Sequence, residues 1–106
     1  MAKEEISIEE QFQFYQQQLQ SVLIQKESLK LQTIEIDRTL EELEKTDKKS
    51  AYKIVGRVMV SKPVDELKKE LKEAKEDAEL KIKSLEKTEE RITSKLKELQ
   101  ASIKGG

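Results

Sequence analysis

Residues 51–60 read AYKIVGRVMV and differ from everything around them. Their Tyr, Ile and Val residues favour extended strands, whereas the flanking stretches are rich in Glu, Lys, Gln and Leu, which favour helices. The dipeptide at Gly56 fits a two-residue type II′ turn, whose first position needs the positive φ that glycine adopts easily. The stretch therefore predicts one β-hairpin, over residues 51–61, in a chain that is otherwise helical.

The predicted hairpin has two largely apolar faces. The turn sets Val55 opposite Val58 and Ile54 opposite Met59; one face then carries Tyr52, Ile54 and Met59, and the other Val55, Val58 and Val60. A lone two-stranded hairpin is marginal in water, and its edges are open to pairing with other chains. Two interpretations follow. The hairpin is a tight connection folded onto the helices, which would cover only one face, or it joins subunits into a shared sheet or closed barrel.

The segment before the hairpin predicts a helix over residues 7–46. Ser7 and Glu10 fit a capping box at its start. Apolar residues then recur in alternating steps of three and four, with Lys26 and Thr33 as the polar exceptions, which is typical of a coiled-coil seam. The series is Phe12, Tyr15, Leu19, Val22, Lys26, Leu29, Thr33, Ile36, Leu40 and Leu43.

The segment after the hairpin predicts a second helix over residues 63–104. Pro63 suits the first helical position, and two acidic residues follow where the helix dipole favours them. Its seam contains two consecutive steps of four around Ala78, a stutter that locally unwinds a supercoil. The series is Val64, Leu67, Leu71, Ala74, Ala78, Ile82, Leu85, Glu89, Ile92, Leu96, Leu99 and Ile103.

These elements predict a mainly α fold in one domain, residues 1–106. Two helices of similar length, joined by a short segment, are expected to fold back as a long antiparallel coiled coil. This pairing places Leu43 near Val64 and Phe12 near Leu96. Both chain ends then lie at one tip, and the hairpin lies at the other.

Composition argues against several classes of function. Only 35% of the residues are hydrophobic and 41% are charged, which suits a narrow seam better than a thick core. The 21 basic and 22 acidic residues nearly balance, so the chain lacks the surplus of positive charge that nucleic-acid binding normally needs. The chain has no Cys or His and no phosphate-binding Gly-rich loop, so we expect no catalytic site, metal or cofactor. The polar N-terminus and the absence of a long apolar run make a cytoplasmic protein the default expectation.

A helix, then AYKIVGRVMV, then SKPVDELKKEL, then a helix ending LEKTEERITSKLKELQASI resembles the beta-class subunit of prefoldin over nearly the whole chain. The resemblance implies a hetero-hexamer of two alpha and four beta subunits, joined through their hairpins into a double β-barrel. It also implies an ATP-independent molecular chaperone. Six coiled coils would hold unfolded client proteins at their tips and pass them to a group II chaperonin. The lack of Cys and His suits a thermophilic archaeal source.

The resemblance directs attention to apolar residues at three places. At the tip, chain ends fray and would expose apolar groups to clients; these are Ile6, Ile8, Phe12, Phe14, Leu96, Leu99 and Ile103. A possible second client stripe, off the seam, consists of Ile24 and Leu31. The oligomerisation hairpin consists of Tyr52, Ile54, Val55, Gly56, Val58, Met59 and Val60. For Phe12, packing within the coil stays open, and Ile24 and Leu31 also fit scattered surface residues.

Two other functions stay open. One is a structural or adaptor coiled coil that oligomerises through its hairpin and binds one dedicated partner. The other is a homo-oligomeric scaffold built from the same hairpin. Suppressing the aggregation of unrelated denatured proteins would exclude the adaptor, and the assembled mass with an alpha-class partner would test the scaffold.

Overall fold

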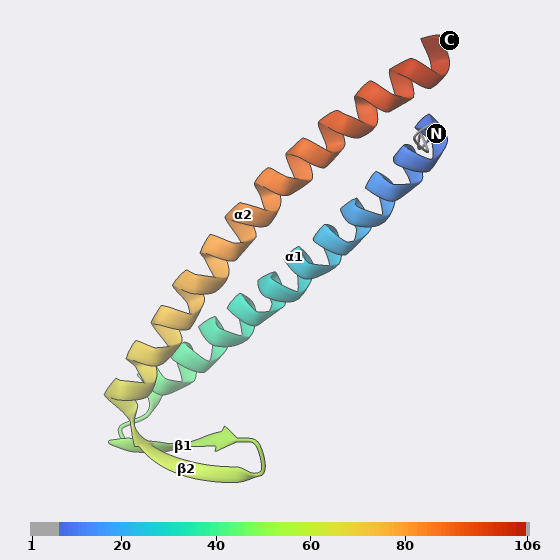
Figure 1. Cartoon of the computed structure of the whole chain (residues 1–106). Coiled ribbons are helices and arrows are strands. Elements are labelled where there is room, and N and C mark those ends of the chain that lie inside the picture. The colour runs from blue at the N-terminus through green and yellow to red at the C-terminus, as the bar shows by residue number, and fades with distance from the viewer. Residues whose placement is uncertain (1–6, 106) are drawn as a thin grey trace. The chain divides into compact units, whose positions relative to one another are not determined.

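The computed structural model describes residues 7–105, and the side chains of residues 7–103. It contains helix α1 (Ile8–Lys45), strands β1 (Ser50–Val55) and β2 (Val58–Pro63), and helix α2 (Val64–Gly105) (Figure 1). The predicted mainly α class, with two long helices joined by one antiparallel hairpin, is confirmed. The single domain over residues 1–106 and the barrel assembly stay predictions.

The helix α1 begins as its capping residue predicts. The Ser7 hydroxyl accepts a hydrogen bond from the Glu10 backbone N–H at 3.1 Å, and the Ser7 carbonyl accepts the first helical bond from Gln11 at 2.9 Å. These bonds satisfy donors that a helix start otherwise leaves unpaired. Ser7 is thus the cap of a helix whose first residue is Ile8, one residue later than predicted.

The hairpin has the predicted register and turn. Val55 pairs with Val58 and Ile54 with Met59. Gly56 has a φ of 61°, and no described non-glycine residue has a positive φ, so Arg57 does not; this combination favours type II′ over type I′.

The hairpin is longer than predicted at its open end. The ladder extends to the pair Ser50–Pro63, and the Val64 N–H donates to the Lys49 carbonyl at 2.8 Å. Pro63 was expected at the first position of the second helix; instead it ends β2. Pro63 is tolerated here because bonded and non-bonded pairs alternate along an antiparallel ladder: the bond to Lys49 comes from Val64, so the N–H that Pro63 lacks would point away from β1.

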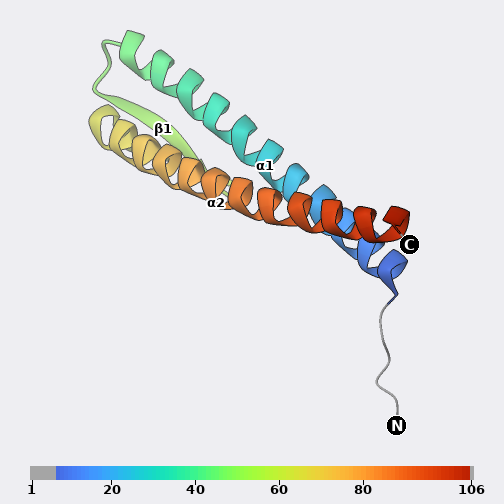
Figure 2. The same cartoon turned by 90° about the horizontal axis from the view of Figure 1, so that it is seen from above.

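The chain forms two compact units, and both helices contribute to each. The hairpin unit is Leu29–Leu80, and the chain-end unit comprises the residues up to Ser28 and from Lys81 onward. In the chain-end unit, the first part of α1 runs alongside the last part of α2 in the opposite direction (Figures 1 and 2). In the hairpin unit, the ion pairs Asp37–Lys75 at 2.7 Å and Glu44–Lys68 at 3.3 Å show the same antiparallel pairing.

Burial follows the predicted seams closely. Every buried apolar residue in the described part of the chain belongs to one of the two series: Val22, Leu43, Val64, Leu67, Ala78, Ile92 and Leu99. Leu43, Val64 and Leu67 form one cluster at the base of the hairpin, against which Ala51 and Leu71 pack. Leu43 therefore lies near Val64, as the antiparallel pairing predicted.

Two predicted seam positions are exposed. Ile103 lies in the last turns of α2, where few neighbours remain to cover it. Ala74 is exposed, while the next residue, Lys75, is half-buried and pairs with Asp37. In the hairpin unit the consecutive steps of four therefore run from Leu67 through Leu71 to Lys75, earlier than predicted.

Two polar seam residues, Lys26 and Glu89, meet in the chain-end unit. Lys26, whose side chain is only 14% exposed, donates to Oε1 of Glu89 at 2.5 Å. This hydrogen bond raises the pKa of Lys26 above its ordinary value. A polar pair inside an apolar seam is satisfied in one helix register only, so it fixes the alignment of the two helices.

Replacing Leu43 with Ala is expected to lower the free energy of unfolding by about 2–3 kcal/mol, because it opens a cavity in the cluster with Val64 and Leu67. Leu31→Ala is the matched control, since Leu31 lies on the same helix and is exposed; it should change stability by no more than about 0.5 kcal/mol. Urea unfolding followed by circular dichroism measures both. Equal losses for the two variants would contradict the assigned core.

Candidate functional site

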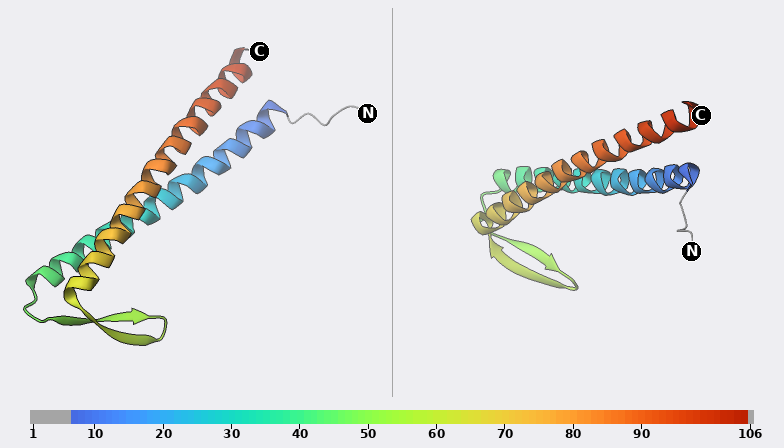
Figure 3. Two further views of the ribbon diagram at one scale, coloured as in Figure 1. Left: turned by 60° about the vertical axis from the view of Figure 1, so that its left-hand side comes forward. Right: turned by 45° about the horizontal axis from the view of Figure 1, so that its top comes forward.

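The hairpin exposes apolar side chains on both faces. Register confirms that the paired residues Ile54 and Met59 share a face, and that Val55 and Val58 share the other. The exposed fractions run from 38% to 72% across the six large apolar residues: Tyr52, Ile54, Val55, Val58, Met59 and Val60. Figure 3 shows the hairpin projecting away from the first turns of α2. The hairpin is therefore not folded flat onto the helices, and the predicted oligomerisation residues are all exposed, including Gly56 at the turn.

An ion-pair cluster holds the base of the hairpin to α2. The Glu70 carboxylate accepts hydrogen bonds from Lys62 on β2 at 2.6 Å and from Lys53 on β1 at 3.2 Å. Lys62 also lies 3.9 Å from Glu66. The Lys62 bond, followed by the Lys53 bond, lowers the pKa of Glu70 below its ordinary 4.5, and the Glu70 bond raises the pKa of Lys62. We call these three residues, Lys53, Lys62 and Glu70, the hairpin clamp.

The clamp acts on only one face of the hairpin. Lys62 pairs with Ala51, and Lys53 pairs with Val60, so both lysines project from the face that carries Val55. A groove of about 270 Å³ lies beside the clamp, with Leu67 and Leu71 among its lining residues. The opposite face, which carries Ile54, makes no such contact with α2, and its apolar residues are the most exposed in the hairpin.

The chain-end unit exposes some of the predicted client residues and buries others. Phe14 is 54% exposed and meets Tyr15 edge to face, with ring centroids 5.5 Å apart. Ile8 and Ile103 are also exposed. The remaining predicted residues are Phe12 and Leu96, which are half-buried, Leu99, which is buried, and Ile6, which lies outside the described residues.

Both residues of the possible second client stripe are exposed. Ile24 is exposed in the chain-end unit, and Leu31 is exposed in the hairpin unit. The sequence analysis missed three further exposed apolar residues: Leu23, Ile34 and Leu80. All three stand outside the predicted seams, so the seam pattern itself was the signal that could have found them.

The family comparison agrees with this arrangement. A family model described as "Prefoldin subunit" matches residues 7–105. The chain belongs to the prefoldin subunit family. Prefoldin subunit beta of Thermococcus kodakarensis is 40% identical over 94 residues, which cover 88% of this chain and 80% of the relative. The corresponding protein of Archaeoglobus fulgidus is 36% identical, with 88% and 81% covered.

A solved structure gives the same result for the fold. The crystal structure of the prefoldin beta subunit from Thermococcus strain KS-1 has a TM-score of 0.82 and 37% identity, and the match covers 92% of this chain and 87% of that one. The predicted resemblance to beta-class prefoldin is therefore confirmed. The chain is a prefoldin-type chaperone subunit, and its family is a chaperone family.

The described residues contain neither a membrane-spanning helix nor a cluster of metal-ligating side chains. None of the helices within residues 7–105 is both long and apolar enough to cross a membrane. In the same part of the chain, no three Asp or Glu side chains gather into a group that could hold a metal ion.

The sequence analysis also missed the hairpin clamp of this prefoldin subunit. The predicted register already placed Lys53 and Lys62 on one hairpin face, which was the available signal. Their acceptor, Glu70, could not be chosen among the many acidic residues of α2 without knowing how the hairpin leaves the helix.

The clamp predicts a pH dependence of stability. The pKa of Glu70 is lower in the folded chain than its ordinary 4.5, so its contribution is fully present above that value and is lost as the pH falls below it. Glu70→Gln should therefore lower the melting temperature at pH 7, and the difference from the unmodified chain should shrink towards pH 3. Glu73→Gln is the control, because Glu73 is exposed and forms no ion pair within the described residues. A Glu70→Gln difference that stays constant with pH would contradict the clamp.

Proposed function

We propose that this prefoldin subunit assembles through its hairpin with alpha-class partners into a hexamer of two alpha and four beta subunits. The observation that carries the proposal is the exposure of apolar side chains on both hairpin faces. Burying one such Val, Ile or Met contributes about 1.5–3 kcal/mol, so covering several of them drives association. A double β-barrel formed from six hairpins would cover both faces and remove the open strand edges.

The chaperone activity is proposed to reside in the chain-end unit. There Ile8, Phe14 and Ile103 offer apolar contacts to non-native clients, and such contacts need no nucleotide. Separating the first turns of α1 from the last turns of α2 would add Phe12, Leu96 and Leu99. Ile6 belongs to the same proposal because of its place in the sequence. Captured clients would then pass to a group II chaperonin. The cytoplasmic location expected from the sequence stays a prediction.

The adaptor function remains the alternative. Nothing in the exposed residues specifies one dedicated partner, because the chain-end residues are apolar and differ in shape, and several weak apolar contacts suit varied clients better than one fixed surface.

Assembly is tested by placing a charge in the hairpin. Val58→Asp should leave the chain helical but abolish the hexameric mass with an alpha-class partner, because an unpaired carboxylate is strongly disfavoured in a buried strand interface. Gln16→Asp introduces the same charge at an exposed site of α1 and should assemble normally. Native mass spectrometry measures both. A hexamer formed by the Val58→Asp chain would disprove assembly through the hairpin.

Client capture is tested by two sets of substitutions. Ile8→Ser, Phe14→Ser and Ile103→Ser together should strongly reduce protection of a denatured model protein against aggregation, because the three exposed anchors act jointly. Ile24→Ser with Leu31→Ser is the comparison set, because both residues are at least as exposed as the first three but lie farther from the chain ends in the sequence. Light scattering at equal hexamer concentration is the measurement. Full protection by the first set and lost protection in the second would move the client site to Ile24 and Leu31.

A further inference from the structure

A groove with an apolar floor and cationic sides lies between the helices of the chain-end unit. It encloses about 530 Å³ and is lined by Tyr15 and Gln18 from α1 and by Thr88, Arg91, Ile92 and Lys95 from α2. Ile92 is buried and forms its apolar floor. Tyr15 adds a half-buried ring, which Phe14 extends by edge-to-face contact.

The charge in this groove is of one sign. Arg91 and Lys95 are the only charged residues among those that line it. α1 supplies no compensating acid, because residues 11–25 contain no charged side chain at all. The groove therefore holds two cations beside a helix face that cannot neutralise them.

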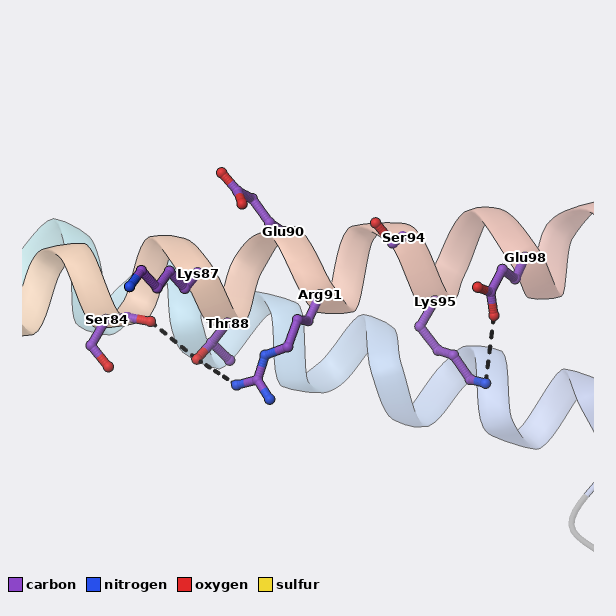
Figure 4. A pocket seen from close by; sticks show the side chains of 8 residues that line it. All are labelled: Ser84, Lys87, Thr88, Glu90, Arg91, Ser94, Lys95 and Glu98. Carbon is purple, nitrogen blue, oxygen red and sulfur yellow. Dashed lines mark hydrogen bonds and ion pairs between the residues drawn. The ribbon is translucent and has the colours of Figure 1, made fainter.

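Neither cation is strongly engaged. Arg91 donates to the Thr88 hydroxyl at 3.2 Å and forms no ion pair with any residue that the structure describes. Lys95 lies 3.6 Å from Glu98, and both side chains are substantially exposed, so this pair contributes little and exchanges readily. Figure 4 shows both contacts, with the Arg91 and Lys95 side chains lying on the side of α2 that faces α1.

The adjoining groove on α2 lacks this character. It holds about 630 Å³ and shares Arg91 and Lys95 with the first groove, but Glu90 and Glu98 also line it, so its charge is mixed. An anion would meet carboxylates there. The groove at Tyr15 and Arg91 has cationic and neutral donors and no carboxylate.

We propose that the groove at Arg91 and Lys95 binds acidic–apolar segments of non-native clients. One client carboxylate lies between the guanidinium of Arg91 and the ammonium of Lys95, where charge-assisted hydrogen bonds are strongest. The neighbouring apolar side chain of the client packs on Tyr15 and Ile92. The inference rests on the proposed client capture and adds to it a preference for Asp or Glu beside an apolar residue.

The test uses a labelled peptide of alternating Asp and Leu and its counterpart with Asn for Asp. In the assembled full-length chain, Arg91→Gln with Lys95→Gln should bind the Asp peptide about five- to tenfold more weakly, as expected for two exposed ion pairs. Binding of the Asn peptide should be unchanged. Lys83→Gln with Lys97→Gln is the control: it removes two positive charges from the same helix, and neither residue lines the groove. It should change binding of the Asp peptide by less than about twofold. Fluorescence anisotropy is the measurement.

Three results would overturn the groove proposal. If the control variant weakens binding of the Asp peptide as much as the groove variant does, only the net charge of the helix matters. An equal loss for the Asn peptide would exclude carboxylate recognition. A single-stranded oligonucleotide that binds as tightly as the Asp peptide, with the same dependence on Arg91 and Lys95, would make the groove a general polyanion site.

A separate measurement keeps the groove apart from the proposed chaperone function. Protection of a denatured protein that lacks acidic segments reports client capture alone. If that protection persists while the two peptides bind equally, only the groove proposal fails. If the unmodified complex gives no protection, client capture itself fails.

Discussion

The structure depends on one constraint: each of two paired helices can bury only a single narrow stripe of side chains. With 35% hydrophobic residues, the chain has enough apolar material for that stripe and some to spare. The stripe contains every buried apolar residue of the described chain, and the surplus is left in water, much of it on the hairpin. A protein that could build a thick core would have covered those side chains itself. This chain leaves them exposed, which suits a subunit that assembles with others, and the chain belongs to the prefoldin subunit family.

Polar contacts then decide how the apolar parts are presented. The pair of Lys26 and Glu89 aligns the helices in the chain-end unit, and the pair of Asp37 and Lys75 does so in the hairpin unit. The clamp at Glu70 ties one hairpin face to α2 and leaves the face with Ile54 free. None of these contacts is deeply buried, so each contributes modestly to stability while strongly restricting geometry.

Much of the fold could be predicted from spacing, because a seam of threes and fours leaves few alternatives for which residues are buried. The turn at Gly56 and the register beyond it followed from local chemistry in the same way. Ala74 was wrongly predicted to lie in the seam. The apolar residues on either side allow the stutter to fall one turn earlier or later, and the ion pair between Lys75 and Asp37 is what places Lys75, not Ala74, against α1. The groove at Arg91 was missed for a related reason: it combines Tyr15 with residues more than 70 positions away, and their meeting depends on the register of two whole helices. The burial of Leu99 likewise depends on how far the helices stay paired near the chain ends, which spacing does not reveal.

The pair of Lys26 and Glu89 has a consequence for motion in the chain-end unit. Helix separation that starts at the chain ends can proceed turn by turn through apolar contacts, each of which is replaced gradually by water or by another apolar group. At Lys26 it reaches a bond between opposite charges that must be broken in one step. The pair is thus the first contact along this path that carries information on the helix register. Separation that stays within the roughly five helical turns of α1 between Ile8 and Lys26 leaves this pair, and with it the alignment of the two helices, intact.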